Sequence, residues 1–252
     1  MEENHNDVPA KAQDKRMIAC IGIAAVVIAL NFFNFGWYIL YPFALLYTFV
    51  HEMGHGISAV LMGGDFVKFE MWSNGSGVAT YSGSFSRLAD AFVAFGGLVA
   101  PAVMAAIFLL VARRPKAARI GLYISFGICA LSIILVVRNL FGILFVALCG
   151  GAAFALAKFP KSDKVPQYSM LVLAMTLCTM VFSRGDYLFT EVAHTTAGDA
   201  PSDVACIAND LFLPYWFWGG LIAAISVALL FFGIRGFFRS SVAKPAPKAI
   251  EE

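Results

Sequence analysis

Long apolar runs, separated by short polar or charged segments, dominate the chain. A helix that crosses a bilayer needs about 20 apolar residues. Seven runs are candidates, at about 17–34, 38–62, 90–112, 119–137, 139–158, 168–185 and 213–235. The polar segment 1–16 and the basic segment 237–252 are predicted to be tails. We therefore expect an all-α polytopic membrane protein, with one domain over 17–236 and six to seven transmembrane helices.

Two segments interrupt the helical pattern. In the loop 65–87, residues 66–72 partly alternate apolar and polar side chains, residues 73–77 are rich in turn formers, and a second short apolar segment follows. This pattern predicts a small β-hairpin between the second and third runs. The hairpin is either a simple connector or an exposed edge that pairs with an extended peptide.

The second interruption is the loop 186–212, which is acidic and contains no Lys or Arg. Ser202 is placed to cap a short helix that runs through residues 204–208. The acidic residues of this loop are Asp186, Glu191, Asp199, Asp203 and Asp210.

Composition supports a membrane protein and excludes several other classes. Of the 252 residues, 60% are hydrophobic and only 13% are charged, whereas soluble domains carry about 25% charged residues. A net charge of +2 gives no reason to expect a nucleic-acid partner. The five Cys are scattered without a Cys-x-x-Cys pair, so they predict small buried residues rather than a disulfide framework or a zinc cluster.

Basic residues predict the orientation of the chain. Three clusters fall on one side if the runs from residue 90 onward are correct, and that side is expected to be cytoplasmic. The hairpin and the acidic loop then lie on the opposite side. Counting backward places the N-terminus outside, whereas Lys11, Lys15 and Arg16 favour the inside, and the sequence leaves this conflict open. The clusters are Arg113, Arg114, Lys116 and Arg119; Lys158, Lys161 and Lys164; and Arg235, Arg239, Lys244 and Lys248.

The second run contains the sequence His-Glu-Met-Gly-His at residues 51–55. On a helix, His51 and His55 share one face and can bind one metal ion, while Glu52 lies beside them and can accept a proton from water. The alternative is a polar cluster that hydrogen-bonds within a helix bundle. Two His and a Glu need partners that an apolar core seldom supplies, which favours the metal site.

A catalytic zinc ion takes three protein ligands and a water, so a third ligand is needed. The acidic loop supplies the candidates, because its residues can approach the bundle from the side of the hairpin. Asp203 can do so if its short helix packs inward, and Asp186 can do so as a continuation of the preceding helix. Asp199, Asp210 and His194 are further possibilities, and spacing alone does not choose among these residues.

The chain resembles the site-2 protease class of intramembrane zinc metalloproteases, and within it the compact bacterial M50B-like branch. The stretches that carry the likeness, in order, are 51–56, 61–64, 76–78, 96–102, 137–142, 202–204, 213–214 and Trp218. The resemblance implies Zn²⁺ bound by His51, His55 and Asp203, with Asp186 as the alternative third ligand and Glu52 as general base. The Asn-Pro/Leu-Asp-Gly motif, which supplies the metal-binding Asp in better-studied members, is absent from the sequence.

The resemblance also implies an enzyme of a bacterial plasma membrane that hydrolyses a membrane-embedded peptide or protein. Arg138 and Asn139 would stabilise the oxyanion or serve as structural support. One alternative is a non-catalytic, metal-binding scaffold or regulator of the same fold. Another is a metal or solute transporter, which is disfavoured because the polar residues gather at one helix and one loop rather than along several spans.

Overall fold

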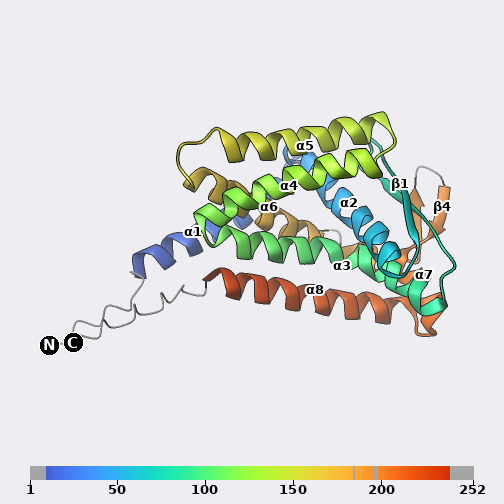
Figure 1. Cartoon of the computed structure of the whole chain (residues 1–252). Coiled ribbons are helices and arrows are strands. Elements are labelled where there is room, and N and C mark those ends of the chain that lie inside the picture. The colour runs from blue at the N-terminus through green and yellow to red at the C-terminus, as the bar shows by residue number, and fades with distance from the viewer. Residues whose placement is uncertain (1–9, 184, 196–197, 239–252) are drawn as a thin grey trace, which may run out of the picture.

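Helices form most of the protein, with two small sheets at one end of the bundle (Figure 1). The computed structural model describes residues 10–183, 185–195 and 198–238; the side chains of 10–16, 186 and 194–195 are outside this description. The helices are α1 (Ala10–Leu30), α2 (Gly36–Leu61), α3 (Arg87–Ala112), α4 (Pro115–Leu135), α5 (Leu140–Lys158), α6 (Lys164–Ser183), the 3₁₀ helix η1 (Gly185–Phe189), α7 (Asp203–Leu211) and α8 (Tyr215–Phe238). The strands are β1 (Asp65–Met71), β2 (Gly77–Ser82), β3 (Val192–Thr195) and β4 (Gly198–Pro201).

Five helical segments within the described residues are long and apolar enough to cross a membrane. They are α3, α4, α5, α8 and the segment Lys164–Phe189, which begins with α6. These five correspond to the last five predicted runs. The apolar part of α1, Met17–Leu30, is shorter, and α2 is not among the five. The protein is therefore an integral membrane protein of mainly helical structure.

The two ends of the bundle differ in character. The α3–α4 turn, the α5–α6 turn and the end of α8 lie at one end, where α1 also begins, and the two sheets lie at the other (Figure 1). At the first end, Arg119 Nε lies 2.6 Å from Asp163 Oδ1 and its guanidinium donates to the carbonyls of Ala157 and Pro160. Because α1 begins where α8 ends, the fold favours the orientation in which the N-terminal basic residues lie on the same side as the other basic clusters.

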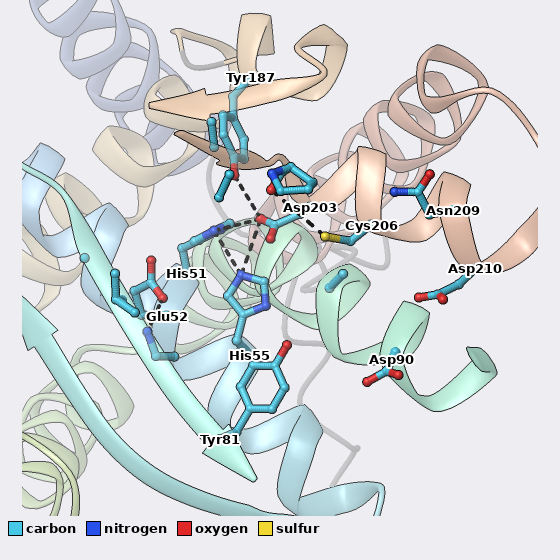
Figure 2. A pocket seen from close by; sticks show the side chains of 17 residues that line it. His51, Glu52, His55, Tyr81, Asp90, Tyr187, Asp203, Cys206, Asn209 and Asp210 are labelled. Atoms are coloured by element: carbon cyan, nitrogen blue, oxygen red, sulfur yellow. Dashed lines mark hydrogen bonds and ion pairs between the residues drawn. The ribbon is translucent and has the colours of Figure 1, made fainter. Parts of the chain in front are cut away.

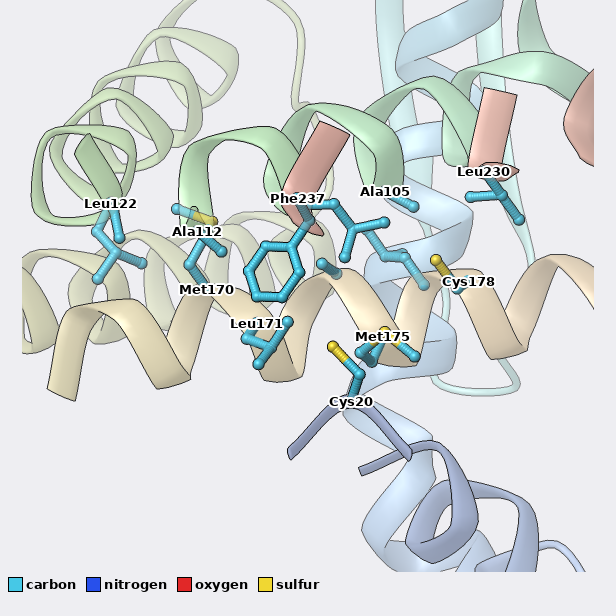
Figure 3. Packing of buried hydrophobic residues seen from close by; sticks show 14 of the residues in the cluster. Cys20, Ala105, Ala112, Leu122, Met170, Leu171, Met175, Cys178, Leu230 and Phe237 are labelled. Carbon is cyan, nitrogen blue, oxygen red and sulfur yellow. The ribbon is translucent and has the colours of Figure 1, made fainter. Parts of the chain in front are cut away.

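Small residues allow the helices to approach one another in the main core. Ala102, Ala105 and Ala112 on α3 are fully buried, and small residues at helix interfaces let backbones come close. Large side chains from α6 and α8 fill the space around them, including Met170 and Phe237 (Figure 3). All five Cys are free; Cys20, Cys129 and Cys178 are buried as predicted, whereas Cys149 and Cys206 are only partly buried.

The loop 65–87 contains an antiparallel hairpin in which Glu70 pairs with Val78. On its other side, β1 is bridged to the α4–α5 connection: Phe69 N donates to Val136 O at 2.7 Å and Arg138 N donates to Phe69 O at 3.0 Å. The carboxamide of Asn139 accepts from Met71 N at 3.1 Å and donates to Met71 O at 2.5 Å. These contacts make β1 an inner strand and leave β2 as the outer edge.

The turn of this hairpin is fastened to α2. Thr48 Oγ1 donates to Gly75 O at 2.9 Å, and Tyr41 OH donates to Ser73 O at 2.5 Å. Gly75 has a φ of 90°, a conformation that favours glycine. The hairpin is thus held on one side by Asn139 and on the other by α2, so its outer strand has a fixed position beside residues 51–55.

Asn139→Ala should lower the free energy of unfolding by about 1–3 kcal/mol, because the variant leaves the Met71 backbone groups unpaired and removes the cap that Gly142 N uses. Thermal unfolding in detergent measures the change. Asn139→Asp keeps the acceptor oxygen, so it should lose less stability than Asn139→Ala. Equal losses in the two variants would show that the acceptor contacts contribute nothing.

A candidate metal centre at the hairpin end of the bundle

Two histidines of α2 and the first residue of α7 converge at one point (Figure 2). Asp203 Oδ2 lies 3.2 Å from His51 Nε2 and 3.4 Å from His55 Nε2. The two Nε2 atoms are 3.2 Å apart. The structure therefore brings together the two motif histidines and the acidic residue that the sequence proposed first as the third ligand.

Asp203 reaches this point because α7 packs into the bundle. Val204 and Ile207 of α7 are fully buried against α3 and α8. The helix begins at Ser202, whose hydroxyl accepts from Ala205 N at 3.3 Å and donates to the carbonyl of Thr190. The predicted cap at Ser202 is thus confirmed, and the helix extends beyond the predicted 204–208 to Leu211.

His55 is oriented by a backbone carbonyl of α3. Its Nδ1 lies 3.0 Å from Val93 O, and a nitrogen that faces a carbonyl must carry the proton. In the neutral ring the lone pair is then on Nε2, which points at His51 and Asp203. A carbonyl partner on the remote nitrogen is how metal-binding histidines are commonly held.

Glycines make this arrangement possible. A Cβ on Gly97 would lie 2.1 Å from His55 Nε2, and one on Gly54 would lie 2.5 Å from Gly96 O. The crossing of α2 and α3 therefore has no room for a side chain at these positions. Similarly, a Cβ on Gly56 would lie 2.1 Å from the ring of Phe66. The glycines around the motif serve close packing.

The donor set fits a zinc ion. Zinc bonds to His nitrogen and carboxylate oxygen of about 2.0–2.1 Å in tetrahedral geometry place the ligand atoms about 3.3–3.4 Å apart. The three distances in the cluster, 3.2, 3.2 and 3.4 Å, agree with this spacing. Two imidazoles and one carboxylate leave a fourth position open, as catalytic zinc sites require.

Electrostatics keep the carboxylate of Asp203 charged. Burial by itself would raise its pKa. The attraction of His55 in its protonated form, and the hydrogen bonds that the imidazoles donate in that form, outweigh this effect and hold the pKa below its usual value. Cys206, one turn further along α7, behaves differently. Burial, and then the charge of Asp203, raise the pKa of its thiol.

Glu52 lies beside the cluster without being part of it. Its Oε2 accepts a hydrogen bond from Ala79 N of β2 at 2.7 Å. The side chain is buried, and a Cβ on Gly77 would lie 2.9 Å from its Cγ. The hairpin thus places one backbone N–H and one glycine against the carboxylate, and Glu52 stays free of the metal ligand set.

A cavity of about 440 Å³ opens at this cluster. β2 forms one wall, β3 and β4 contribute Ala193 and Ala200, and α3 and α7 supply Asp90 and Asp210. Among the described residues that line it, none is Lys or Arg. The cavity therefore exposes the cluster and Glu52 to a ligand while carrying a negative lining.

Arg138 and Asn139 do not line this cavity. Arg138 donates to carbonyls at the C-terminal end of α4, including that of Leu135, and Asn139 holds β1. The sequence suggested two roles for these residues, oxyanion stabilisation and structural support. Their contacts agree with structural support, and neither residue lies at the cavity where an oxyanion would form.

The remaining sequence candidates lie apart from the cluster or outside the description. Asp210 lines the cavity without joining the cluster, and Asp199 lines a neighbouring cavity. The side chains of Asp186 and His194 are outside the described residues. Sequence reasoning missed Tyr81 and Tyr187, which both line the cavity. No motif marks either residue, and only the fold brings them to the site.

Comparison with known proteins assigns the chain to a family. The model of the family described as Peptidase M50B-like matches residues 18–233. The chain belongs to this family, which confirms the resemblance to the M50B branch of the site-2 proteases. No significant match was found among curated proteins or solved structures.

Gly97→Ala should reduce the zinc content of the purified protein, because the new methyl group would displace the His55 ring; overpacking of this kind costs about 1–3 kcal/mol. Elemental analysis of the purified variant measures zinc per chain. Gly151→Ala is the matched control, since a Cβ there meets nothing within 4 Å. Zinc retained in full by Gly97→Ala would contradict the close packing of His55.

Asp203→Ala should lower zinc affinity by more than about 100-fold, because loss of a ligand costs more than the 10- to 100-fold that loss of a ligand's partner costs. Competition with a chelator measures the affinity. Asp210→Ala, on the same helix and cavity, should retain zinc. The assignment of Asp203 is wrong if its variant binds zinc normally while Asp186→Ala or Asp210→Ala does not.

Proposed function

We propose that the protein is an intramembrane zinc-dependent endopeptidase that hydrolyses a peptide bond of a membrane-embedded substrate. The observation that carries this proposal is the pairing of a three-residue metal-binding cluster with a separate carboxylate, Glu52, on one cavity. Membership of the Peptidase M50B-like family supports the same reaction class.

In this proposal His51, His55 and Asp203 hold Zn²⁺ and Glu52 transfers protons. When bound, zinc would lower the pKa of a water molecule toward 7 and polarise the carbonyl group of the substrate. Glu52 accepts the proton of the attacking water and passes it to the leaving nitrogen, the usual work of a general base that turns into an acid. Its hydrogen bond to Ala79 N keeps the carboxylate beside the cavity during both transfers.

The outer strand of the hairpin is suited to hold the substrate. Ala79 N points away from β1, since it reaches Glu52, and Phe69 opposite bonds to the α4–α5 connection instead. By strand alternation the backbone groups of Gly77 also face outward. A transmembrane helix has its backbone groups paired and must unwind before hydrolysis. An extended segment can then add to this edge as a further strand.

Glu52 separates this proposal from a metal-binding scaffold of the same fold. A structural metal site needs its ligands and no neighbouring base, yet here a buried carboxylate is held at the cavity without joining the cluster. The transporter alternative is weaker, because the ionisable residues of the cavity gather at one end of the bundle on α2, α3 and α7.

Glu52→Gln should retain zinc and lose cleavage by at least about 10²- to 10⁴-fold, the contribution typical of a general base. Gln keeps an oxygen acceptor for Ala79 N, so the fold should be preserved. The measurement pairs zinc content with mass spectrometry of a pool of single-span membrane peptides incubated with each protein. The protease proposal fails if the zinc-loaded wild type cleaves none of them, or if the variant complements a deletion strain as well as the wild type does.

A further inference from the structure

Peptide hydrolysis needs a donor for the charge that develops on the carbonyl oxygen, and a preorganised hydrogen bond to this oxygen is commonly a large part of catalysis. Arg138 and Asn139 lie outside the cavity, and its described lining contains no Lys or Arg. The neutral side chains of the lining that can donate through N–H or O–H are the hydroxyls of Tyr81 and Tyr187 and the carboxamide of Asn209. Figure 2 shows Asn209 pointing away from the cluster, so the question is which hydroxyl is directed at it.

Tyr187 is directed at the cluster. Its hydroxyl lies 3.4 Å from Asp203 Oδ2, the oxygen that also faces both imidazoles. Its ring meets the ring of His51 edge-on, with the centroids 6.2 Å apart. Figure 2 shows the side chain extending from the loop segment to the carboxylate. The hydroxyl is therefore next to the position where a carbonyl bound at the cluster would lie.

The backbone around Tyr187 is held firmly. A Cβ on Gly219 of α8 would lie 1.9 Å from Leu188 O, so α8 packs directly against η1. Leu188 is buried, and the nearby carbonyl of Thr190 accepts from the hydroxyl of Ser202 at the start of α7. The same cap thus positions Asp203 and the segment that carries Tyr187, which makes the hydroxyl preorganised relative to the cluster.

The hydrogen bond from the Tyr187 hydroxyl to Asp203 is long, so the hydroxyl can give it up for another acceptor. Hydroxyl hydrogen bonds in proteins are most often about 2.7–2.8 Å long, and this bond of 3.4 Å is weaker. A shorter hydrogen bond to the oxyanion would therefore gain more than the loss of this long bond costs. Tyr81 is less suited, because its side chain is at the exposed rim against Phe85 and its hydroxyl bonds to none of the described residues.

We propose that Tyr187 is a catalytic residue of the peptidase reaction, donating its hydroxyl hydrogen bond to the oxyanion of the tetrahedral intermediate; this rests on the proposed function. The oxygen of the attacking water bonds to the carbonyl carbon while its proton moves to Glu52, and the electron pair of the C=O double bond moves to oxygen. The C–N bond then breaks, the C=O bond re-forms, and the nitrogen receives the proton from Glu52. Tyr187 keeps its own proton throughout.

A purely positioning role is the competing explanation. In that case the hydroxyl would act through Asp203, as partners of metal ligands do, and its loss would weaken zinc binding by about 10- to 100-fold. Zinc affinity and affinity for a tetrahedral anion therefore separate the two roles. The first reports on the ligand Asp203, and the second on a donor to the oxyanion.

The test uses the full chain in detergent, loaded with zinc, and compares wild type, Tyr187→Phe and the control Tyr168→Phe, an exposed tyrosine on α6. The probe is a phosphinic pseudopeptide, whose tetrahedral anionic group mimics the intermediate. Tyr187→Phe should bind this probe about 10²- to 10³-fold more weakly, the range seen for loss of one oxyanion donor. Zinc affinity should change by less than about twofold, because the bond to Asp203 that is lost with the hydroxyl is long and weak.

Two results would overturn the assignment of Tyr187. One is unchanged binding of the phosphinate by Tyr187→Phe, and the other is weaker zinc binding that accounts for the whole loss. A wild-type protein that holds zinc but does not bind the phosphinate would instead refute the proposed peptidase function itself. Binding is measured by isothermal titration calorimetry, so the outcome does not depend on knowing a substrate.

Discussion

One carboxylate oxygen of Asp203 faces two imidazoles, and the functional end of the protein is built around this contact. An ionised carboxylate in an apolar bundle is costly unless opposite charges, hydrogen bonds or a metal surround it. The cluster satisfies Asp203, and it does so only if α7 packs inward and α2 presents residues 51 and 55 on one face. The acidic loop is therefore part of the core at this end of the bundle rather than a surface connector.

Glycine determines how closely the histidines can approach this carboxylate. At Gly54, Gly96 and Gly97 the backbones of α2 and α3 are near enough that a methyl group would overlap its neighbours. This closeness brings Val93 O to His55 Nδ1 and so fixes which nitrogen faces the cluster. Close packing and the chemistry of the site therefore depend on the same helix contact. If α3 moved away, the His55 ring would lose its fixed orientation, and Val93 O would no longer determine which ring nitrogen carries the proton.

The sequence predicted which residues cluster better than it predicted what surrounds them. The spacing of His51 and His55 is a local property of a helix, and the cap at Ser202 is local too, so both were predictable. Asp203 and Asp186 could not be separated by spacing, because the choice depends on how a long loop packs. Arg138 and Asn139 were assigned by residue type, yet tertiary pairing places them at β1. Tyr187 had no local signal, since its proposed role depends on its distance from a residue on another element.

The hairpin connects substrate binding to catalysis in the proposed reaction. Ala79 N is already bonded to Glu52, so a peptide added to β2 meets an occupied donor at that position and outward backbone groups at Gly77. The peptide carbonyl opposite Ala79 N consequently lacks an edge partner. In the proposed complex this carbonyl would lie beside Glu52, and it would lose the least by turning toward the metal cluster and the hydroxyl of Tyr187. In this proposal the register of the edge strand selects which bond is cut, and the contacts of Asn139 and Thr48 keep that strand in place.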